Sequence, residues 1–221
     1  MIVIDRLFSI IAPFNCVGCG VEGLLLCPVC RGRLPAIPSR CYRCNRATPD
    51  FRTCASCRHS SPLFQVWAAT SYEQQAKLLI HKLKFERAQA AAHDVAASIA
   101  TLLPHDQPWI ITHVPTASAR VRVRGYDQAQ LIAKQLARQL GCRYLPLLAR
   151  TIAVRQVGQG GAARRRQMKH AFRAVHRGDI ASAHILLVDD VITTGSTCEA
   201  AAQTLRDTGA AQVSAAVFAA A

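Results

Sequence analysis

The chain has 221 residues, 51% of them hydrophobic, and its 27 Lys and Arg outnumber its 13 Asp and Glu to give a formal net charge of +14. This composition is typical of a globular protein and excludes a largely disordered chain, and the length suits one domain of ordinary size plus a small one. The positive charge favours polyanionic partners such as nucleic acid, phosphorylated metabolites or an anionic membrane surface, without choosing among them.

The first 14 residues form an apolar stretch that nevertheless carries Asp5 and Arg6. The stretch has neither a basic start nor a small-residue cleavage site, so we expect no signal peptide. We predict a helix that packs on the body of the protein, and a weak membrane or partner contact is the alternative. No apolar run in the sequence reaches the length of a membrane-spanning helix.

Eight of the ten cysteines lie in four Cys-x-x-Cys pairs. Each pair can hold a metal ion in a tight turn, and two pairs complete the tetrahedral thiolate shell that structural zinc takes. Gly20 and Asn45, which each follow a pair, tolerate the left-handed backbone that such a turn requires. The sequence therefore predicts two structural zinc sites. Their candidate ligands are Cys16, Cys19, Cys27, Cys30, Cys41, Cys44, Cys54 and Cys57.

The spacing of the four pairs leaves their grouping open. Consecutive pairs sharing one ion each is the simplest arrangement, and first with third plus second with fourth is the alternative. A disulfide framework would need an oxidising compartment, which nothing in the sequence signals, and an iron–sulfur cluster is the weaker rival. Seven arginines between residues 31 and 58 make this region basic. It either binds nucleic acid or a partner, or only holds surfaces together.

A stretch with Ser60, Ser61 and Pro62 is typical of a linker. It predicts an N-terminal helix and double zinc ribbon over residues 1–62, followed by a second domain over 63–221. Alternating strand and helix patterns in the second domain predict a mainly parallel twisted sheet with helices on both faces. The predicted order is strand 66–72, helix 73–84, helix 88–103, strand 109–114, helix 126–140, strand 143–148, strand 185–188, helix 196–208, and an edge or penultimate strand 212–218.

The first predicted helix of this domain places Leu78, Leu79 and Leu83 inward. It ends with Lys82 and Lys84, which either lie near phosphates or form a solvated helix end.

Residues 115–128 form a predicted basic loop directly after a strand, where an α/β sheet places ligand contacts. Arg120, Arg122 and Arg124 could clamp a pyrophosphate bidentately, which lysines could not. Tyr126 could stack on a base.

Residues 150–167 are rich in Gly and Arg and have no apolar period. The pattern indicates a mobile basic loop that either closes over a bound phosphate ester or is a plain basic surface loop. Its candidate flexible-loop or nucleic-acid contacts are Arg150, Arg155, Gln156, Arg164, Arg165 and Arg166.

The most informative stretch of the chain is 185–197. It opens with a short apolar run over 185–188, β-branched at both ends, as in a strand buried on both faces. Two adjacent carboxylates, Asp189 and Asp190, follow this strand. A loop of small and hydroxyl-bearing residues then spans 193–197.

A predicted helix starts within this loop. Ser196 and Glu199 have capping-box spacing, and Gly209 stands where a helix C′ residue belongs. Backbone N–H groups at a helix start, beside Thr and Ser hydroxyls, suit a phosphate, and Gly195 lets the backbone approach it closely. The carboxylates suit sugar hydroxyls, so the stretch predicts a sugar-phosphate site. A P-loop and a dinucleotide fingerprint are excluded because their glycine patterns are missing.

The run from Val188 to Thr197 resembles the phosphoribosyl-pyrophosphate (PRPP) signature of type I phosphoribosyltransferases. With the cysteine pairs, the whole chain resembles the competence protein F (ComF) family of phosphoribosyltransferase-like proteins with an N-terminal double zinc ribbon. Asp127, Gln159 and Gln167 depart from the residues usual in that family. Further matching positions are 81–85, 114–115, Arg120, 124–126, Gln128, Arg150, Gln156, Arg166 and 171–172.

The resemblance implies the type I phosphoribosyltransferase fold and binding of PRPP with Mg²⁺. The candidate catalytic residues are Asp189 and Asp190 on the ribose diol and Arg120 and Arg124 on the pyrophosphate. The resemblance also implies a cytoplasmic protein that handles imported single-stranded DNA, with a competence helicase as candidate partner, and dimers are common in this fold. The PRPP-binding candidates are Asp189, Asp190, Val191, Thr193, Thr194, Gly195, Ser196 and Thr197.

Two hypotheses about activity follow. The first is an enzyme that transfers the phosphoribosyl group of PRPP to an acceptor, which requires the site to stabilise leaving pyrophosphate and to aim a nucleophile. The second is a non-catalytic zinc-ribbon protein that binds nucleic acid or a partner on a retired transferase fold. The sequence favours the phosphoribosyltransferase interpretation of the site and does not reveal the acceptor.

Overall fold

The computed structural model describes residues 14–86, 88–151 and 171–221. Nearly all of the predicted N-terminal helix lies outside the described residues, and so do the candidates Arg155, Gln156, Arg164, Arg165 and Arg166. The described elements are α2 (Pro28–Gly32), η1 (Pro49–Phe51), α3 (Ala55–Arg58), β1 (Val66–Ser71), α4 (Gln74–Phe85), α5 (Ala91–Ala100), β2 (Ile110–His113), α6 (Ser118–Arg124), α7 (Gln128–Leu140), β3 (Arg143–Tyr144), β4 (Leu148–Arg150), β5 (Phe172–Ala174), α9 (Arg177–Ile180), β6 (His184–Ile192), α10 (Ser196–Asp207) and β7 (Gln212–Ala220).

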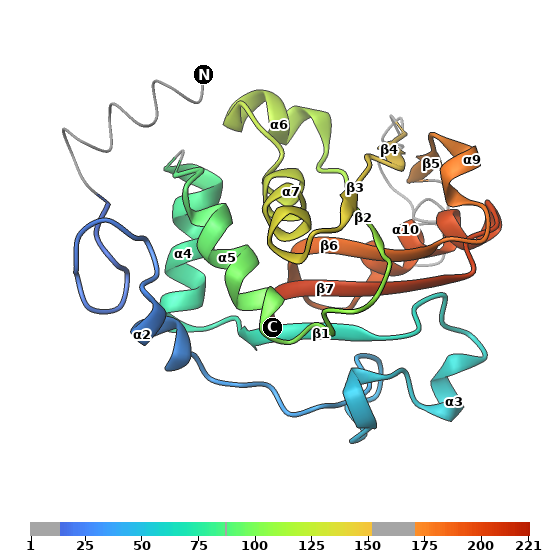
Figure 1. Ribbon diagram of the computed structural model, residues 1–221, viewed down its shortest axis with the longest axis horizontal. Helices are drawn as coiled ribbons and strands as arrows, with labels where there is room; N and C mark the ends of the chain where they lie inside the picture. Colours follow the sequence, from blue (N-terminus) through green and yellow to red (C-terminus); the bar gives the residue numbers. More distant parts are fainter. Residues whose placement is uncertain (1–13, 87, 152–170) are drawn as a thin grey trace, which may run out of the picture.

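A five-stranded parallel sheet with the order β1-β7-β6-β2-β3 forms the centre of the fold (Figure 1). Its longest strands, β6 and β7, have nine residues each and contain the apolar runs 185–188 and 215–220. Such continuous apolar runs are typical of parallel strands that are buried on both faces. The predicted α/β class with a parallel sheet is confirmed, and β7 takes the penultimate of the two predicted positions.

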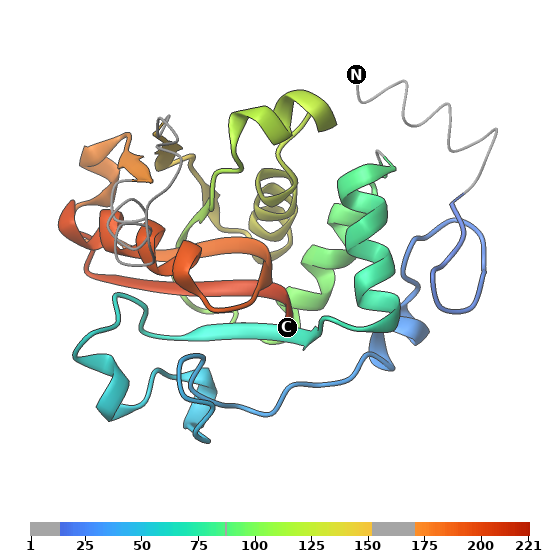
Figure 2. The ribbon, with the colours of Figure 1, turned by 180° about the vertical axis from the view of Figure 1, so that it is seen from behind.

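Helices cover both faces of this sheet, as Figures 1 and 2 show from opposite sides. Along β6, Leu186 and Val188 pack with α4, α5 and α7, whereas Ile185 and Leu187 pack with α10 on the other face. This division follows from the two-residue side-chain period of a strand. The chain therefore has two core layers separated by one sheet.

The prediction for the inward face of α4 is partly wrong. Leu79 and Leu83 are fully buried, but Leu78 is 53% exposed. The buried stripe of this helix runs through Ala76, Leu79, Ile80 and Leu83, which is the three- and four-residue spacing of one helical face. Leu78 lies off that stripe.

The predicted strand 143–148 is divided between two sheets. Only Arg143 and Tyr144 pair with β2, while Leu148 begins β4 of a separate antiparallel pair with β5. Pro146 lies between the two parts and has no N–H to donate to a ladder. The Leu147 N–H instead donates to Thr112 Oγ1 at 3.1 Å, and the chain leaves the main sheet.

The predicted loop over 115–128 contains a helix, α6. Gly125 ends this helix in the left-handed region, with φ +84°. Asp127 then caps α7, because its side chain accepts hydrogen bonds from the N–H groups of Ala129 and Gln130. Tyr126 also turns inward, since its hydroxyl donates to the carbonyl of Leu83. The three basic residues of this segment therefore sit on a helix rather than on an irregular loop.

The N-terminal region passes along the outer edge of β1 and reaches both faces of the sheet (Figures 1 and 2). On the α5 side, the Leu26 N–H donates to Oδ2 of the buried Asp94 at 2.9 Å. At the edge, Thr70 Oγ1 donates to the Pro35 carbonyl at 2.9 Å. Tyr42 packs against the core layer on the α10 side. Within the ranges that the structure describes, no helix combines the length and apolarity needed to cross a bilayer.

Candidate functional site

The acidic pair lies inside β6 rather than after it. The strand continues to Ile192, so the two neighbouring carboxylates extend toward opposite faces of the sheet. Asp190 is buried and its Oδ2 lies 2.8 Å from Lys84 Nζ, at the end of α4. Asp189 turns toward α10, where its Oδ2 accepts from the Cys198 thiol at 4.0 Å. Each carboxylate therefore has its own surroundings.

These surroundings leave the negative charge of Asp189 poorly compensated. Burial and the adjacent Asp190 carboxylate raise the pKa of Asp189 well above its usual range, although the Asp190 N–H donates to its Oδ1 at 2.8 Å. Burial and Asp189 also raise the pKa of the Cys198 thiol, which keeps it neutral. A site with this electrostatic imbalance gains from a cation or from hydroxyl donors on a ligand.

A hydroxyl-rich turn joins β6 to α10. Gly195 is the N-cap residue, with φ +76°, and the turn exposes the flanking Thr193, Thr194 and Ser196. Thr194 Oγ1 and Ser196 Oγ lie 2.8 Å apart on the surface. The turn therefore presents hydroxyls beside the start of a 12-residue helix, which is an arrangement that suits an anion.

The predicted capping box at this helix is wrong. Gly195, not Ser196, is the N-cap, and no side chain caps the helix start. Glu199 instead accepts hydrogen bonds from Tyr42 and Arg43 of the cysteine-rich region. The left-handed conformation of Gly195 shifts the helix start by one residue relative to the sequence pattern.

The predicted PRPP-binding residues Val191, Thr197 and Gly195 are less exposed than the flanking hydroxyl residues. Val191 packs against the core layer on the α4 side. Thr197 is partly exposed in the first turn of α10, and Gly195 is buried beneath the flanking hydroxyl residues.

A cavity of about 690 Å³ opens beside Lys84 at the end of α4. Arg120 and Arg124 from α6 line it together with Lys84, which also contacts Asp190. The Arg124 guanidinium lies 5.2 Å from the centre of the Phe85 ring and donates to Gln128 Oε1 at 2.7 Å. The structure thus brings the predicted arginines and the predicted carboxylates to one end of the sheet.

Arg150 joins these cations from the start of the basic segment. It donates to the Pro115 carbonyl at 3.3 Å and lies over the ring of Phe172 at 5.3 Å. Burial and the neighbouring Arg120 lower the pKa of Arg150, and Asp189 opposes that shift. Arg150 is therefore the described member of the predicted flexible-loop set that faces the site.

Asp127, which departs from the family pattern, ties the loop after β2 to α7. Its carboxylate accepts from the Thr116 N–H at 2.7 Å and from Thr116 Oγ1 at 3.0 Å. The same Oδ1 caps α7. An aspartate performs this structural task with acceptors alone.

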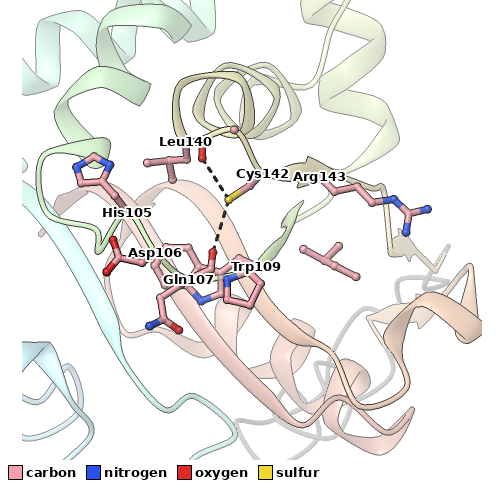
Figure 3. Close-up of a pocket in the computed structure, with 10 residues that line it drawn as sticks. His105, Asp106, Gln107, Trp109, Leu140, Cys142 and Arg143 are labelled. Carbon is pink, nitrogen blue, oxygen red and sulfur yellow. Dashed lines mark hydrogen bonds between the residues drawn. The ribbon is translucent and has the colours of Figure 1, made fainter.

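A second cavity of about 480 Å³ lies at the opposite end of the sheet (Figure 3). It is formed where β2 and β3 begin, and its wall includes Trp109 and Cys142, whose Sγ lies 3.8 Å from the Gln107 carbonyl. Ligands of open α/β sheets bind outside the carboxyl ends of the strands. The cavity beside Asp190 has that position and this one does not.

The eight paired cysteines form two clusters from consecutive pairs. Within each cluster the four sulfur atoms lie within 4.8 Å of one another. Gly20 and Asn45 adopt the predicted left-handed conformation, with φ +75° and +58°. The crossed grouping is thereby ruled out, and the thiolate donor set fits zinc. The clusters are Cys16, Cys19, Cys27 and Cys30, and Cys41, Cys44, Cys54 and Cys57.

The thiols within the first cluster have divergent acidities. Burial opposes ionisation of Cys16, but backbone N–H donors outweigh it and lower the pKa of Cys16 to about 6. Burial and the neighbouring thiols raise the pKa of Cys30 to about 12. Four close thiols cannot all ionise unless a cation lies between them, so this donor set fits a metal ion.

The sequence analysis missed two parts of the site. It did not link Lys84 to Asp190, although it marked Lys84 as a candidate near phosphates. It did not place Tyr42 and Arg43 against α10, since they lie more than 150 residues from Glu199 along the chain. No local pattern signals such a distant contact.

Comparison with known proteins agrees with this arrangement. The family described as "Phosphoribosyl transferase domain" matches residues 127–221. "DNA utilization protein YhgH" of Salmonella typhimurium is 33% identical over 204 residues, covering 85% of this chain and 87% of the relative. "Competence protein F" of Haemophilus influenzae is 28% identical over 219 residues, with 90% and 94% covered. "Competence protein ComFC" of Bacillus subtilis is 26% identical, with 84% and 80% covered.

These similarities to full-length relatives cover 84–90% of this chain. Their coverage, the parallel fold and the two four-cysteine clusters agree with the family resemblance of the sequence. The chain belongs to the ComF family of phosphoribosyltransferase-like proteins.

Proposed function

We propose that the chain binds PRPP with Mg²⁺ at the carboxyl end of β6. The observation that carries this proposal is the hydroxyl-rich turn at the start of α10, which follows an acidic pair. Asp190 of this pair contacts Lys84, one of three cationic side chains that line the neighbouring cavity. The 5′-phosphate would take the backbone N–H groups and hydroxyls of residues 193–197. The ribose hydroxyls would take Asp189 and Asp190.

The cavity beside Asp190 suits the pyrophosphate part of the ligand. Arg120, Arg124 and Lys84 line it, and arginines bind phosphate oxygens bidentately. Mg²⁺ prefers carboxylate oxygens, water and substrate phosphates. Asp189 and Asp190 fit that preference, because their mutual repulsion, seen in the raised pKa of Asp189, would be relieved by a cation. When bound, Mg²⁺ would neutralise the pyrophosphate.

The biological role that we propose is the handling of imported single-stranded DNA in the cytoplasm. The names of the relatives, which refer to competence and to DNA utilization, support this role. The net charge of +14 supports a polyanionic partner. Phosphoribosyl transfer is the activity that such a site would perform, and a binding function on the same site is the alternative.

The first experiment is calorimetry of Mg²⁺-dependent PRPP binding to zinc-loaded protein. We expect saturable binding that is lost in the Asp189→Asn/Asp190→Asn variant. Asp207→Asn, at the exposed end of α10, is a matched control for removing one carboxylate. Absence of PRPP binding by the wild type, with both zinc ions present, would contradict the proposal.

Transferase activity and DNA binding need separate tests. Release of pyrophosphate from PRPP in the presence of candidate acceptors, including single-stranded DNA, would support the enzyme. DNA binding that depends mainly on phosphate contacts should weaken steeply with salt, whereas salt-insensitive binding would count against it. Arg124 beside the 63%-exposed Phe85 favours this second function, because aromatic rings and arginines stack on bases.

A further inference from the structure

Residues 41–46 form a tight turn, which we call the knuckle, closed by the hydrogen bond from the Cys41 N–H to the Arg46 carbonyl. It reaches across to the first turn of α10 through Tyr42 and Arg43, the two residues between Cys41 and Cys44. The Tyr42 hydroxyl donates to Glu199 Oε1 at 2.6 Å, and Arg43 Nε donates to the same oxygen at 2.5 Å. The Arg43 and Glu199 side chains are 25% and 24% exposed, so this ion pair is partly shielded from water.

The Tyr42 ring also lies directly against Gly195. A Cβ atom on Gly195 would come within 3.0 Å of Tyr42 Cε2 and 3.1 Å of Cδ2. These contacts are closer than ordinary van der Waals separation, so the ring and the glycine backbone fit each other closely. Tyr42 thus supports the buried side of the turn whose other side exposes Thr194 and Ser196.

The contact of Tyr42 and Arg43 with Glu199 affects anion binding at the start of α10. Glu199 lies in the first turn of the helix, since its N–H donates to the Gly195 carbonyl at 2.8 Å. An unpaired carboxylate there would repel a bound phosphate. Arg43 neutralises that charge, and both knuckle residues hold the carboxylate on the side of α10 that faces the cysteine cluster.

We propose that Tyr42 and Arg43 are positioning residues for the phosphate-binding turn, and that metal binding at the second cysteine cluster and phosphate-ester binding at the turn strengthen each other. This inference rests on the proposed function. The metal would hold Cys41 and Cys44, and hence the two residues between them, in the conformation that meets Gly195 and Glu199. Because coupling between two binding sites is reciprocal, either ligand raises the affinity for the other by the same factor.

The first cysteine cluster offers a matched comparison within the same chain. It docks on α5 through the hydrogen bond from the Leu26 N–H to Asp94, on the other face of the sheet. Both clusters have the same four-cysteine chemistry. Their docking partners differ, so metal removal from each cluster separates coupling to the turn from a general loss of stability.

The test uses zinc-loaded full-length protein and ribose 5-phosphate as the probe. Calorimetry compares the wild type with Tyr42→Phe, Tyr42→Ala and Arg43→Ala. Arg46→Ala, an exposed position in the same knuckle, controls for the lost charge. We expect about tenfold weaker binding in Tyr42→Ala and Arg43→Ala, within the usual range of coupling between sites. We expect a smaller loss in Tyr42→Phe, which keeps the ring, and little change in Arg46→Ala.

Zinc release to a chelator provides a readout that is independent of activity. Cys19→Ser and Cys57→Ser assign the release phases to the first and second clusters. We expect ribose 5-phosphate to slow release from the second cluster only, and we expect Tyr42→Ala to abolish that protection. Wild-type affinity in folded, zinc-loaded Tyr42→Ala, together with zinc release that does not respond to ribose 5-phosphate, would overturn the inference.

Hydrogen exchange separates failure of this inference from failure of the proposed function. If the wild type does not bind ribose 5-phosphate, the proposed PRPP site fails, but exchange still reports on the link between knuckle and turn. Faster exchange across residues 193–199 in Cys57→Ser, and not in Cys19→Ser, supports the link. Unchanged exchange there after the second cluster is emptied overturns it.

Discussion

Asp189 and Asp190 are adjacent in sequence, yet β6 gives them different electrostatic partners. Asp190 lies 2.8 Å from the Lys84 ammonium, whereas Asp189 faces the neutral thiol of Cys198. Burial and the neighbouring Asp190 carboxylate raise the pKa of Asp189 well above its usual range. Sites that bind charged ligands commonly sacrifice stability in this way.

Replacing Asp189 by Asn should therefore stabilise the free protein at neutral pH. The pKa of the Asp189 carboxyl is higher in the folded protein than in the unfolded chain. Its contribution to stability is therefore fully present below the unfolded-state pKa of about 3.9 and is lost as pH rises through the folded-state pKa. We expect the melting temperature of Asp189→Asn to exceed that of the wild type by about 2–4 °C at pH 7.

Calorimetric melting between pH 4 and pH 8 measures this difference. The difference in melting temperature between Asp189→Asn and the wild type should grow as pH rises. The variant should also lose PRPP binding. The exposed Asp207→Asn should show neither change. A variant that is less stable than the wild type across the whole range would contradict the prediction.

Removing Lys84 should destabilise the protein, in contrast to replacing Asp189, because Asp190 would lose its cationic partner. Lys84→Met leaves a buried carboxylate without its cation, and we expect a loss of about 2–4 kcal/mol in the free energy of unfolding. Adding Asp190→Asn removes the orphaned charge and should restore more than half of that loss. Urea denaturation of the two single variants and the double variant forms the thermodynamic cycle. Purely additive losses would show that the two residues do not interact.

At the scale of elements, the turn before α10 depends on a glycine for two separate reasons. Gly195 has φ +76°, and the Tyr42 ring occupies the space beside it. Gly141 ends α7 with φ +65° and has open space around its Cα. Both positions therefore require a residue that tolerates a positive φ. Only at Gly195 would an added side chain also meet a neighbouring residue.

Comparing alanine substitutions at these glycines measures the packing requirement alone. Gly141→Ala should cost about 1–2 kcal/mol because of the left-handed backbone. Gly195→Ala should cost more in urea denaturation, since the new methyl group meets the Tyr42 ring. The excess should shrink when Gly195→Ala is made in a Tyr42→Ala background. Equal losses at both glycines would argue against close packing of the knuckle on the turn.

At the scale of the whole molecule, the cysteine clusters are packed into the fold rather than attached to it. Cys16, Cys27 and Cys30 are buried in the same core layer as α4 and α5, and Tyr42 contacts the opposite layer. Structural zinc supplies folding free energy. We therefore expect that losing it affects the sheet as well as the N-terminal region.

Zinc removal should lower the melting temperature of the entire chain. We expect two zinc ions per chain by elemental analysis and a colourless protein, which distinguishes zinc from an iron–sulfur cluster. Chelation should shift the main calorimetric transition downward, and added zinc should restore it. A main transition that is unchanged after both ions have been removed would show that the sheet folds independently, as the predicted boundary at residue 62 suggests.

The sequence alone determined the features that depend on local pattern. Apolar runs identified the parallel strands and the class of fold, and cysteine spacing with Gly20 and Asn45 identified two four-cysteine clusters. The stretch from Val188 to Thr197 marked the site because a strand, a turn and a helix start are contiguous. Where local signals competed, as at the capping box and the strand 143–148, the predictions failed: Gly195 adopted the left-handed conformation, and Pro146 interrupted the ladder.

Only the tertiary structure decided which distant residues meet at this site. The fold brings Lys84 of α4 to Asp190 and Tyr42 and Arg43 of the second cluster to Glu199. Such contacts are set by sheet order and by the packing of helices on opposite faces, and these arise from many weak apolar contacts across the whole core. No short stretch of sequence contains that information. The cysteine clusters were therefore predictable from the sequence, whereas the contact between one of them and the turn before α10 was not.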